Sequence, residues 1–232
     1  FANIEFRNAF STEMNTGSLQ LFEAWIQYTF SNDLRIRSGI LTPTFGAFNA
    51  IRDASPTFLG VLPPSVFDEA FEPIDFMPEF ANLMISGSPD LGGVRFEYSL
   101  FVGNGHGIES ETSTDLNNDK SFGGRIGIAP TENLKLGVSA WNSGVEMGES
   151  NIHRHELYGF DILLTEGDFE LRSEVMPGKD IIDGTLYYKF THFVSVAYTL
   201  GSEVTPYILY DYLRSENNLE FSHIQHRWSA GI

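Results

Sequence analysis

Two short motifs have the side chains that a metal site needs. The run Asp115-Leu116-Asn117-Asn118-Asp119 begins like the ligand-bearing part of a calcium-binding EF-hand loop. Its sixth position is Lys120 where the loop needs glycine, and its twelfth is Ile126 where it needs glutamate, so an EF-hand is excluded. A loosely held surface divalent ion is the alternative. His153 and His155 share one face of a strand, but two histidines without a third ligand predict no metal site.

Catalysis and phosphate binding find little support either. Ser150 lies close to His153, as in a hydrolase, but no nucleophile motif surrounds it. The glycine-rich run Gly103-Asn104-Gly105-His106-Gly107 is followed by no helix that could cradle a phosphate. We therefore predict that the chain is not an enzyme, with no catalytic residue, no resident metal and no cofactor.

Strands of about 8–12 residues must position these side chains, and short and long connections alternate between the strands. The short ones are Ser31–Asp33, Pro89–Gly93, Pro130–Asn133, Glu166–Asp168 and Gly201–Val204. The long ones are Thr42–Ala81, Asn104–Lys120, Asn142–Arg154, Pro177–His192 and Glu216–Ile224. A transmembrane barrel closes one rim with short periplasmic turns and covers the other with long loops. A soluble sandwich has no reason to keep every second turn minimal.

The strands alternate apolar and polar residues. In Val94–Gly103 one side is apolar (Val94, Phe96, Tyr98, Leu100, Val102) and the other carries Arg95, Glu97 and Ser99. A sandwich shows such alternation too. Charges of both signs in mid-strand, however, are expected of a water-filled lumen. We predict that ten charged residues line a pore: Arg35, Arg37, Arg95, Glu97, Arg125, Lys135, Asp161, Glu170, Arg172 and Glu174.

Composition narrows the class. No run of about 18 apolar residues exists, so a transmembrane helix is excluded. The net charge is −17 and there is no cysteine. Acids gather in the long connections Thr42–Ala81 and Asn104–Lys120, where they either keep a rim hydrated or concentrate cations at a mouth. The sequence has no basic patch with interleaved aromatic residues, so nucleic-acid binding is not predicted.

The ends of the sequence cut into the strand pattern. A strand is already running at Ala2–Ser11, and the last one, His226–Ile232, stops in mid-pattern. We expect further strands, and a signal sequence, outside the chain. The fold class is therefore all-β: an antiparallel transmembrane β-barrel of about sixteen strands, about twelve of them in this chain. Residues 1–232 are expected to form a single, partial barrel domain.

Three stretches resemble the phosphate-selective porin family. They are the strand and loop opening from Arg35 to Asn49, with its Pro43-Thr44-Phe45-Gly46 turn, the strand from Arg95 to Gly105, and the strand from His226 to Ile232. The resemblance implies a constricted, water-filled barrel that is often trimeric. Phosphate selectivity in that family rests on a ladder of Arg and Lys. This chain has 14 basic residues against 31 acids and departs from that pattern.

The long connection Thr42–Ala81 is too apolar to extend into water. Its apolar residues include Leu59, Val61, Leu62, Val66, Phe67, Phe71, Phe76, Met77 and Phe80. Burying such a side chain is worth ~1.5–3 kcal/mol. We expect this segment, residues 42–81, to fold into or across the barrel mouth as a constriction loop; packing on a neighbouring protomer or a partner is the alternative. Its acids Asp68, Glu69, Glu72, Asp75 and Glu79 would then give the pore a weak cation preference.

Aromatic residues near strand ends predict the two interfacial girdles of a membrane barrel: Trp141, Tyr207, Tyr210, Tyr212 and Trp228.

The sequence thus predicts a porin of the bacterial outer membrane, which passes small hydrophilic solutes or ions by diffusion. Its expected partners are outer-membrane lipids, lipopolysaccharide, its solutes and copies of itself in a homotrimer, but no nucleic acid. The alternatives are a structural or partner-holding barrel without conductance, and a soluble β-rich binding module.

Overall fold

One antiparallel sheet contains every strand that the computed structural model describes. The described residues are 2–7, 18–51, 63–67, 81–104, 120–147, 151–182, 184–201, 204–216 and 222–232. Their strands are β1 (Ala2–Arg7), β2 (Ser18–Ser31), β3 (Leu34–Leu41), β4 (Ala81–Gly87), β5 (Asp90–Leu91), β6 (Val94–Asn104), β7 (Lys120–Ala129), β8 (Leu134–Met147), β9 (Asn151–Glu166), β10 (Phe169–Ile182), β11 (Thr185–Tyr198), β12 (Tyr207–Glu216) and β13 (Ser222–Gly231).

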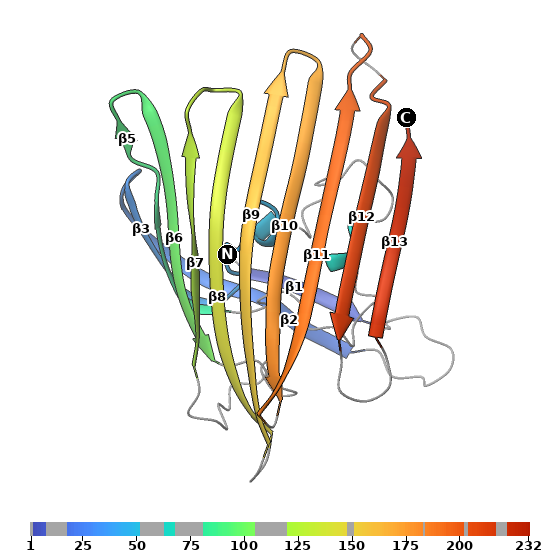
Figure 1. The fold of residues 1–232 in the computed structure, drawn as a ribbon. Helices are drawn as coiled ribbons and strands as arrows, with labels where there is room; N and C mark the ends of the chain where they lie inside the picture. The colour runs from blue at the N-terminus through green and yellow to red at the C-terminus, as the bar shows by residue number, and fades with distance from the viewer. Residues whose placement is uncertain are drawn as a thin grey trace.

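The strands follow one another in chain order across the sheet. The order is β1-β2-β3-β4-β6-β7-β8-β9-β10-β11-β12-β13, and the two-residue β5 pairs with β6 beside this path. The sheet curls, so that β1 and β2 pass behind the strands at the centre of Figure 1. In the described part of the chain β1 and β13 are the two ends of the order. The predicted all-β, antiparallel fold of the outer-membrane barrel type is confirmed, with twelve strands on the main path.

Two short 3-10 helices lie within the connection between β3 and β4. They are η1 (Asn49–Ile51) and η2 (Ser65–Phe67). Neither helix of the described residues has the length and hydropathy needed to cross a membrane.

The two ends of the sheet differ in the length of their connections. At one end β2–β3, β7–β8 and β9–β10 are joined by short turns; those of β7–β8 and β9–β10 stand at the top of Figure 1. We refer to this as the tight-turn end and to the other as the long-loop end. The long connections between β3 and β4 and between β6 and β7, at residues 42–80 and 105–119, both leave from the long-loop end. The predicted alternation therefore holds for these connections.

Two predicted long loops are wrong. Strand β8 continues to Met147 and β9 begins at Asn151, so most of the predicted loop Asn142–Arg154 is strand. Likewise β10 and β11 run through the predicted loop Pro177–His192, with only residues 183–184 between them. Polar residues in these segments suggested loops, but they belong to the ends of unusually long strands. At about 3.3 Å per residue, the sixteen residues of β9 span far more than a ~30 Å hydrocarbon core, so their polar ends extend past it.

Charged pairs hold these extended strands together outside the apolar zone. Lys179 Nζ lies 2.8 Å from Glu156 on β9, and Lys189 Nζ on β11 lies 2.9 Å from Asp180 on β10. Opposite charges on neighbouring strands stabilise a sheet, so charge density was a poor sign of a loop here.

Candidate functional site

The two faces of the sheet present opposite chemistry. The exterior face exposes large apolar side chains: Leu100 is 58% and Phe160 56% exposed. Their chain neighbours Ser99 and Asp161 point to the inner face, the side against which residues 42–51 and 63–67 pack, and are almost fully buried. The predicted assignment of faces is therefore confirmed at these positions. An exposed apolar band on an antiparallel sheet is the surface that a barrel presents to lipid.

The aromatic side chains only partly follow the predicted girdle. Trp228, Tyr210 and Tyr212 do lie on the exterior face, where the Tyr210 and Trp228 ring centroids are 4.6 Å apart. Trp141 and Tyr207, by contrast, are wrong for a girdle, because they point inward and belong to or pack against the buried core. A one-residue step in a strand reverses the face, and aromatic identity alone does not fix it.

One register row organises the inner face. Successive pairings align eight residues across β6 to β13: Glu97, Gly127, Gly137, Asp161, Glu174, Phe193, Asp211 and Arg227. We refer to these residues as the inner row. It holds four carboxylates, and the segment that follows β3 is anchored on two of them, Glu174 and Asp211.

The first anchor holds residues 46–48. The Glu174 carboxylate on β10 accepts hydrogen bonds from the backbone N–H groups of Ala47 and Phe48, the latter at 3.1 Å. The Gly46 N–H donates to Ser139 Oγ on β8 at 2.9 Å. Because backbone donors buried in this way need partners, these side chains fix the path of the segment against the sheet.

Glycines make room for this contact. Gly46 has a φ of +62°, which favours glycine, and a Cβ there would lie 2.6 Å from Glu174 Oε1. On β9, Gly159 lets the Phe45 ring approach, since a Cβ on Gly159 would lie 3.3 Å from it. The Pro43-Thr44-Phe45-Gly46 turn thus fits a seat made of Ser139, Gly159 and Glu174.

The second anchor holds η2 against the last strands. Ser65 Oγ donates to Asp211 Oδ1 on β12, and Arg227 Nε on β13 donates to Asp211 Oδ2 at 2.8 Å. Arg227 also donates to the Pro63 carbonyl. Since one arginine bridges the sheet and the segment, η2 is held by charge-assisted hydrogen bonds.

Apolar side chains fill the space between the two anchors. The Phe193 ring on β11 lies 5.7 Å from the Phe48 centroid and 6.1 Å from the Phe67 centroid. The buried core of the described residues comprises Leu41, Phe45, Phe48, Phe67, Ala81, Met84, Phe101, Trp141, Leu157, Met176, Phe193, Leu209 and Leu213. The inner face is thus not uniformly polar: beside the segment it is packed like a protein interior.

A buried ion pair lies next to this packed zone. The Arg125 guanidinium donates to both carboxylate oxygens of Asp161, at 2.9 and 2.6 Å, and lies 3.4 Å from Glu97. It crosses Gly127 and Gly137, where a Cβ would meet its side chain. Lys135 Nζ lies 3.9 Å from Glu97 and is 44% exposed, so the charges continue toward the tight-turn end in contact with solvent.

A second charged cluster lies toward the long-loop end. His155 Nδ1 is 2.8 Å from Asp180 Oδ1, and Lys189 Nζ is 2.9 Å from the same oxygen. The Trp141 and His155 rings stack with centroids 5.7 Å apart. All but Asp180 are almost fully buried, so this cluster fixes one acid, one lysine and one histidine across β9 to β11.

The ten predicted pore-lining residues all lie in described strands, with side chains on the inner face. Besides the groups above, Arg172 Nε lies 2.7 Å from Glu170 Oε1, and Arg37 stacks over the Trp25 ring at 4.5 Å. Arg35 and Arg95 lie toward the tight-turn end of β3 and β6. The five predicted constriction-loop acids, Asp68, Glu69, Glu72, Asp75 and Glu79, lie outside the described residues.

Sequence reasoning missed the roles of five inner-face residues: His155, Asp180, Lys189, Asp211 and Arg227. Asp211 could have been found, because it alternates with Tyr210 and Tyr212 in the same pattern used for β6. Asp180 and Lys189 were missed because they lie in Pro177–His192, which was wrongly predicted to be a loop. Among the described residues no group of three or more potential ligands could hold a metal ion.

Comparisons with known proteins found similarity to solved structures but to no protein family. No protein-family model matches the sequence, and no curated protein sequence matches it either. Among solved structures, the chain is similar to OmpTdeltaL8, a loop L8 deletion mutant of the outer membrane protein OmpT of Vibrio cholerae. The identity is 7% and the TM-score 0.39, over 93% of this chain and 91% of that chain.

The prediction that the chain is not an enzyme is corrected here. It rested on the missing motif around Ser150, whereas the sheet aligns Ser143, His155 and Asp180 across β8, β9 and β10. A histidine bonded to a carboxylate is an arrangement that hydrolases use.

The structural class follows from the faces of the sheet. Water would not tolerate a continuous exterior band of exposed Leu, Ile, Phe and Tyr, whereas lipid requires one, and every central strand has both neighbours to pair with. The chain is therefore an outer-membrane protein of the β-barrel class.

Proposed function

We propose that the chain forms most of the wall of a water-filled porin channel through which small hydrophilic solutes or ions diffuse. The observation that carries this proposal is the anchoring of the segment after β3 to Glu174 and Asp211 on the inner row. A barrel whose interior is a plain hydrophobic core needs no charged anchors, because a buried ion pair offers little stability over packed apolar residues.

The inner face supports two zones along the path of a solute. Toward the tight-turn end, Arg95 and Lys135 are exposed and solvated, which suits a wide vestibule. At the inner row, the segment at 42–51 and 63–67 fills the space beside the sheet and sets the width. We place the tight turns in the periplasm and the long loops outside the cell, as in other barrels of this class.

Selectivity belongs to the same proposal. The ten inner-face residues predicted from the sequence are mixed in sign, and the phosphate-porin resemblance favours anions. The predicted constriction acids Asp68, Glu69 and Glu72 favour cations. Charges more than ~8–10 Å from a solute are screened by salt, so acids at the narrowest point act on a passing ion more strongly than charges on a wide wall do. We propose a weak cation preference. Reversal potentials in a salt gradient test it: Asp68→Asn/Glu69→Gln/Glu72→Gln should lose the preference. A wild type that prefers chloride or phosphate would assign control to the strand arginines.

Association into a homotrimer and contact with outer-membrane lipids complete the proposed function. Both use the exterior face, since the inner face is occupied by the anchored segment. Light scattering of the detergent-solubilised protein measures the first: a mass of one protomer after subtraction of detergent would reject the trimer.

Conductance in planar bilayers tests the channel itself. The wild type should give stable single-channel steps. Glu174→Ala should release residues 46–48 from β10 and give larger or noisier steps. The matched control Gly92→Ala changes a tight turn with nothing within 4 Å of the new methyl group and should leave the steps unchanged. A barrel that serves only to hold a partner would insert and show no steps at all.

A further inference from the structure

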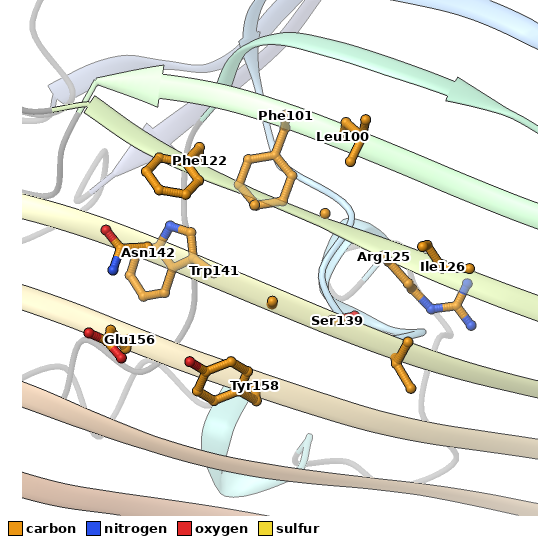
Figure 2. Close-up of a pocket in the computed structure, with 14 residues that line it drawn as sticks. Leu100, Phe101, Phe122, Arg125, Ile126, Ser139, Trp141, Asn142, Glu156 and Tyr158 are labelled. Atoms are coloured by element: carbon orange, nitrogen blue, oxygen red, sulfur yellow. The ribbon is translucent and has the colours of Figure 1, made fainter.

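A groove runs across the exterior face of β6 to β9. It encloses about 620 Å³, and apolar atoms form nearly all of its surface. Figure 2 shows Phe122, Leu100, Ile126 and Tyr158 around it. Leu100, Phe122, Ile126 and Tyr158 are each about half exposed or more, so the groove opens toward lipid and not toward the inner face.

Two small residues form the floor of the groove. Gly124 on β7 and Ala140 on β8 are register partners, and Leu100 pairs with Gly124 on the other side. Gly124 cannot be enlarged, because a Cβ there would meet the Ser99 carbonyl oxygen on β6. Because the strands approach closely at Gly124, only small side chains fit there, and the exterior face is hollowed between the larger side chains on either side.

The groove lies directly beneath charged strand ends. Arg125 and Ser139 also line it, but their side chains point to the inner face; Asn142 and Glu156 are polar lining residues of the exterior face, toward the long-loop end. Beyond them on the exterior face lie Lys120 and Arg154, both exposed, and Lys179, which pairs with Glu156 at 2.8 Å. Among these described groups basic charge exceeds acidic charge, three to one.

We propose that this groove binds one acyl chain of lipopolysaccharide, with a phosphate of the same lipid held by Lys120 and Arg154. The inference rests on the orientation given under the proposed function, because only the long-loop end meets the outer leaflet. An apolar groove below a basic rim matches a lipid whose anionic head sits above its chains. A second copy of the chain would need an interface of about 800 Å² per partner, which this local depression does not supply.

Native mass spectrometry of the whole detergent-solubilised chain tests the proposal. The probes are purified lipopolysaccharide of the deep-rough type, with two phosphates, and phosphatidylethanolamine. The wild type should retain one lipopolysaccharide molecule in preference to phosphatidylethanolamine. Ala140→Phe fills the groove and should weaken retention about tenfold or more, since it displaces several methylene groups. Lys120→Gln/Arg154→Gln should weaken lipopolysaccharide and leave phosphatidylethanolamine unchanged.

A matched variant controls for bulk on the exterior face. Val196→Phe adds a ring on β11, away from the groove, and should retain lipopolysaccharide like the wild type. Equal retention in Ala140→Phe and the wild type overturns the proposal, as does dimerisation that Ala140→Phe abolishes without any bound lipid. Conductance of the same samples separates this inference from the channel. Ala140→Phe should conduct normally. A variant that loses the lipid but keeps normal conductance steps supports the groove without testing the channel. A protein that retains the lipid but shows no conductance steps contradicts the channel and leaves the groove intact.

Discussion

The inner and exterior faces of the same strands differ in which side chains they bury and which they expose. Trp141 on the inner face of β8 is 4% exposed, whereas Trp228 on the exterior face of β13 is 72% exposed. On β9 the acid Asp161 is buried and its neighbour Phe160 is exposed. In a soluble protein this would be an inverted arrangement. It is stable here because the exterior face contacts lipid. A large solvent-exposed fraction of an apolar side chain on this face therefore does not imply a cost in stability.

The difference shows where stability and function separate. On the exterior face any apolar residue suffices, because lipid adapts to its shape. The inner face requires particular partners, since Arg125, Asp161 and Glu174 are buried charges or acids that must be hydrogen-bonded. Substitutions should therefore be most costly where a buried charge loses its partner, and less costly where lipid can rearrange.

Asp161→Ala should give the largest effect. It leaves the Arg125 guanidinium buried without its bidentate partner, which costs about 3–5 kcal/mol in comparable pairs. Urea unfolding from lipid vesicles measures the free energy. Replacing both partners, as Arg125→Met/Asp161→Leu, should restore most of the loss. A double variant as unstable as the single one would mean that the cost arises from packing and not from the unpaired charge.

The sequence predicted this contrast in faces better than it predicted what occupies the interior. Alternation gave Leu100 and Phe160 their side correctly, because lipid and lumen impose a strict period of two. It could not reveal that Phe45 sits on Gly159, or that Glu174 binds backbone donors of residues 47 and 48, because both are contacts between segments more than a hundred residues apart. The lengths of β8 to β11 were missed for a related reason: cross-strand pairs such as Lys179 with Glu156 turn loop-like sequence into strand.

Leu136→Arg should come second. Leu136 lies on the exterior face, in the register row that also contains Ile162 and Ile128, near the centre of the apolar band. An arginine in the midplane of a barrel costs about 2–4 kcal/mol. The control is its chain neighbour on the inner face: Lys135→Gln removes a half-exposed charge and should change the unfolding free energy by only about 0.5 kcal/mol. Equal costs at the two positions would mean that the face assignment of β8 is wrong.

Gly46→Ala tests the smallest of the three effects, the fit of the anchored segment to the inner face. Both Gly46 and Gly92 have positive φ, +62° and +69°, and alanine pays about 1–2 kcal/mol in this region. At Gly92 nothing lies within 4 Å, so Gly92→Ala should cost that strain alone. At Gly46 the new methyl group also displaces the Glu174 carboxylate from the N–H groups of Ala47 and Phe48. Gly46→Ala should therefore cost about 1 kcal/mol more than Gly92→Ala, the net value of a hydrogen bond, in the same urea measurement. It should also make the segment a faster substrate for an added protease, since only Gly46 touches an anchor. If the two variants behave alike in both measurements, Glu174 does not hold this segment, and the width of the channel must be set elsewhere.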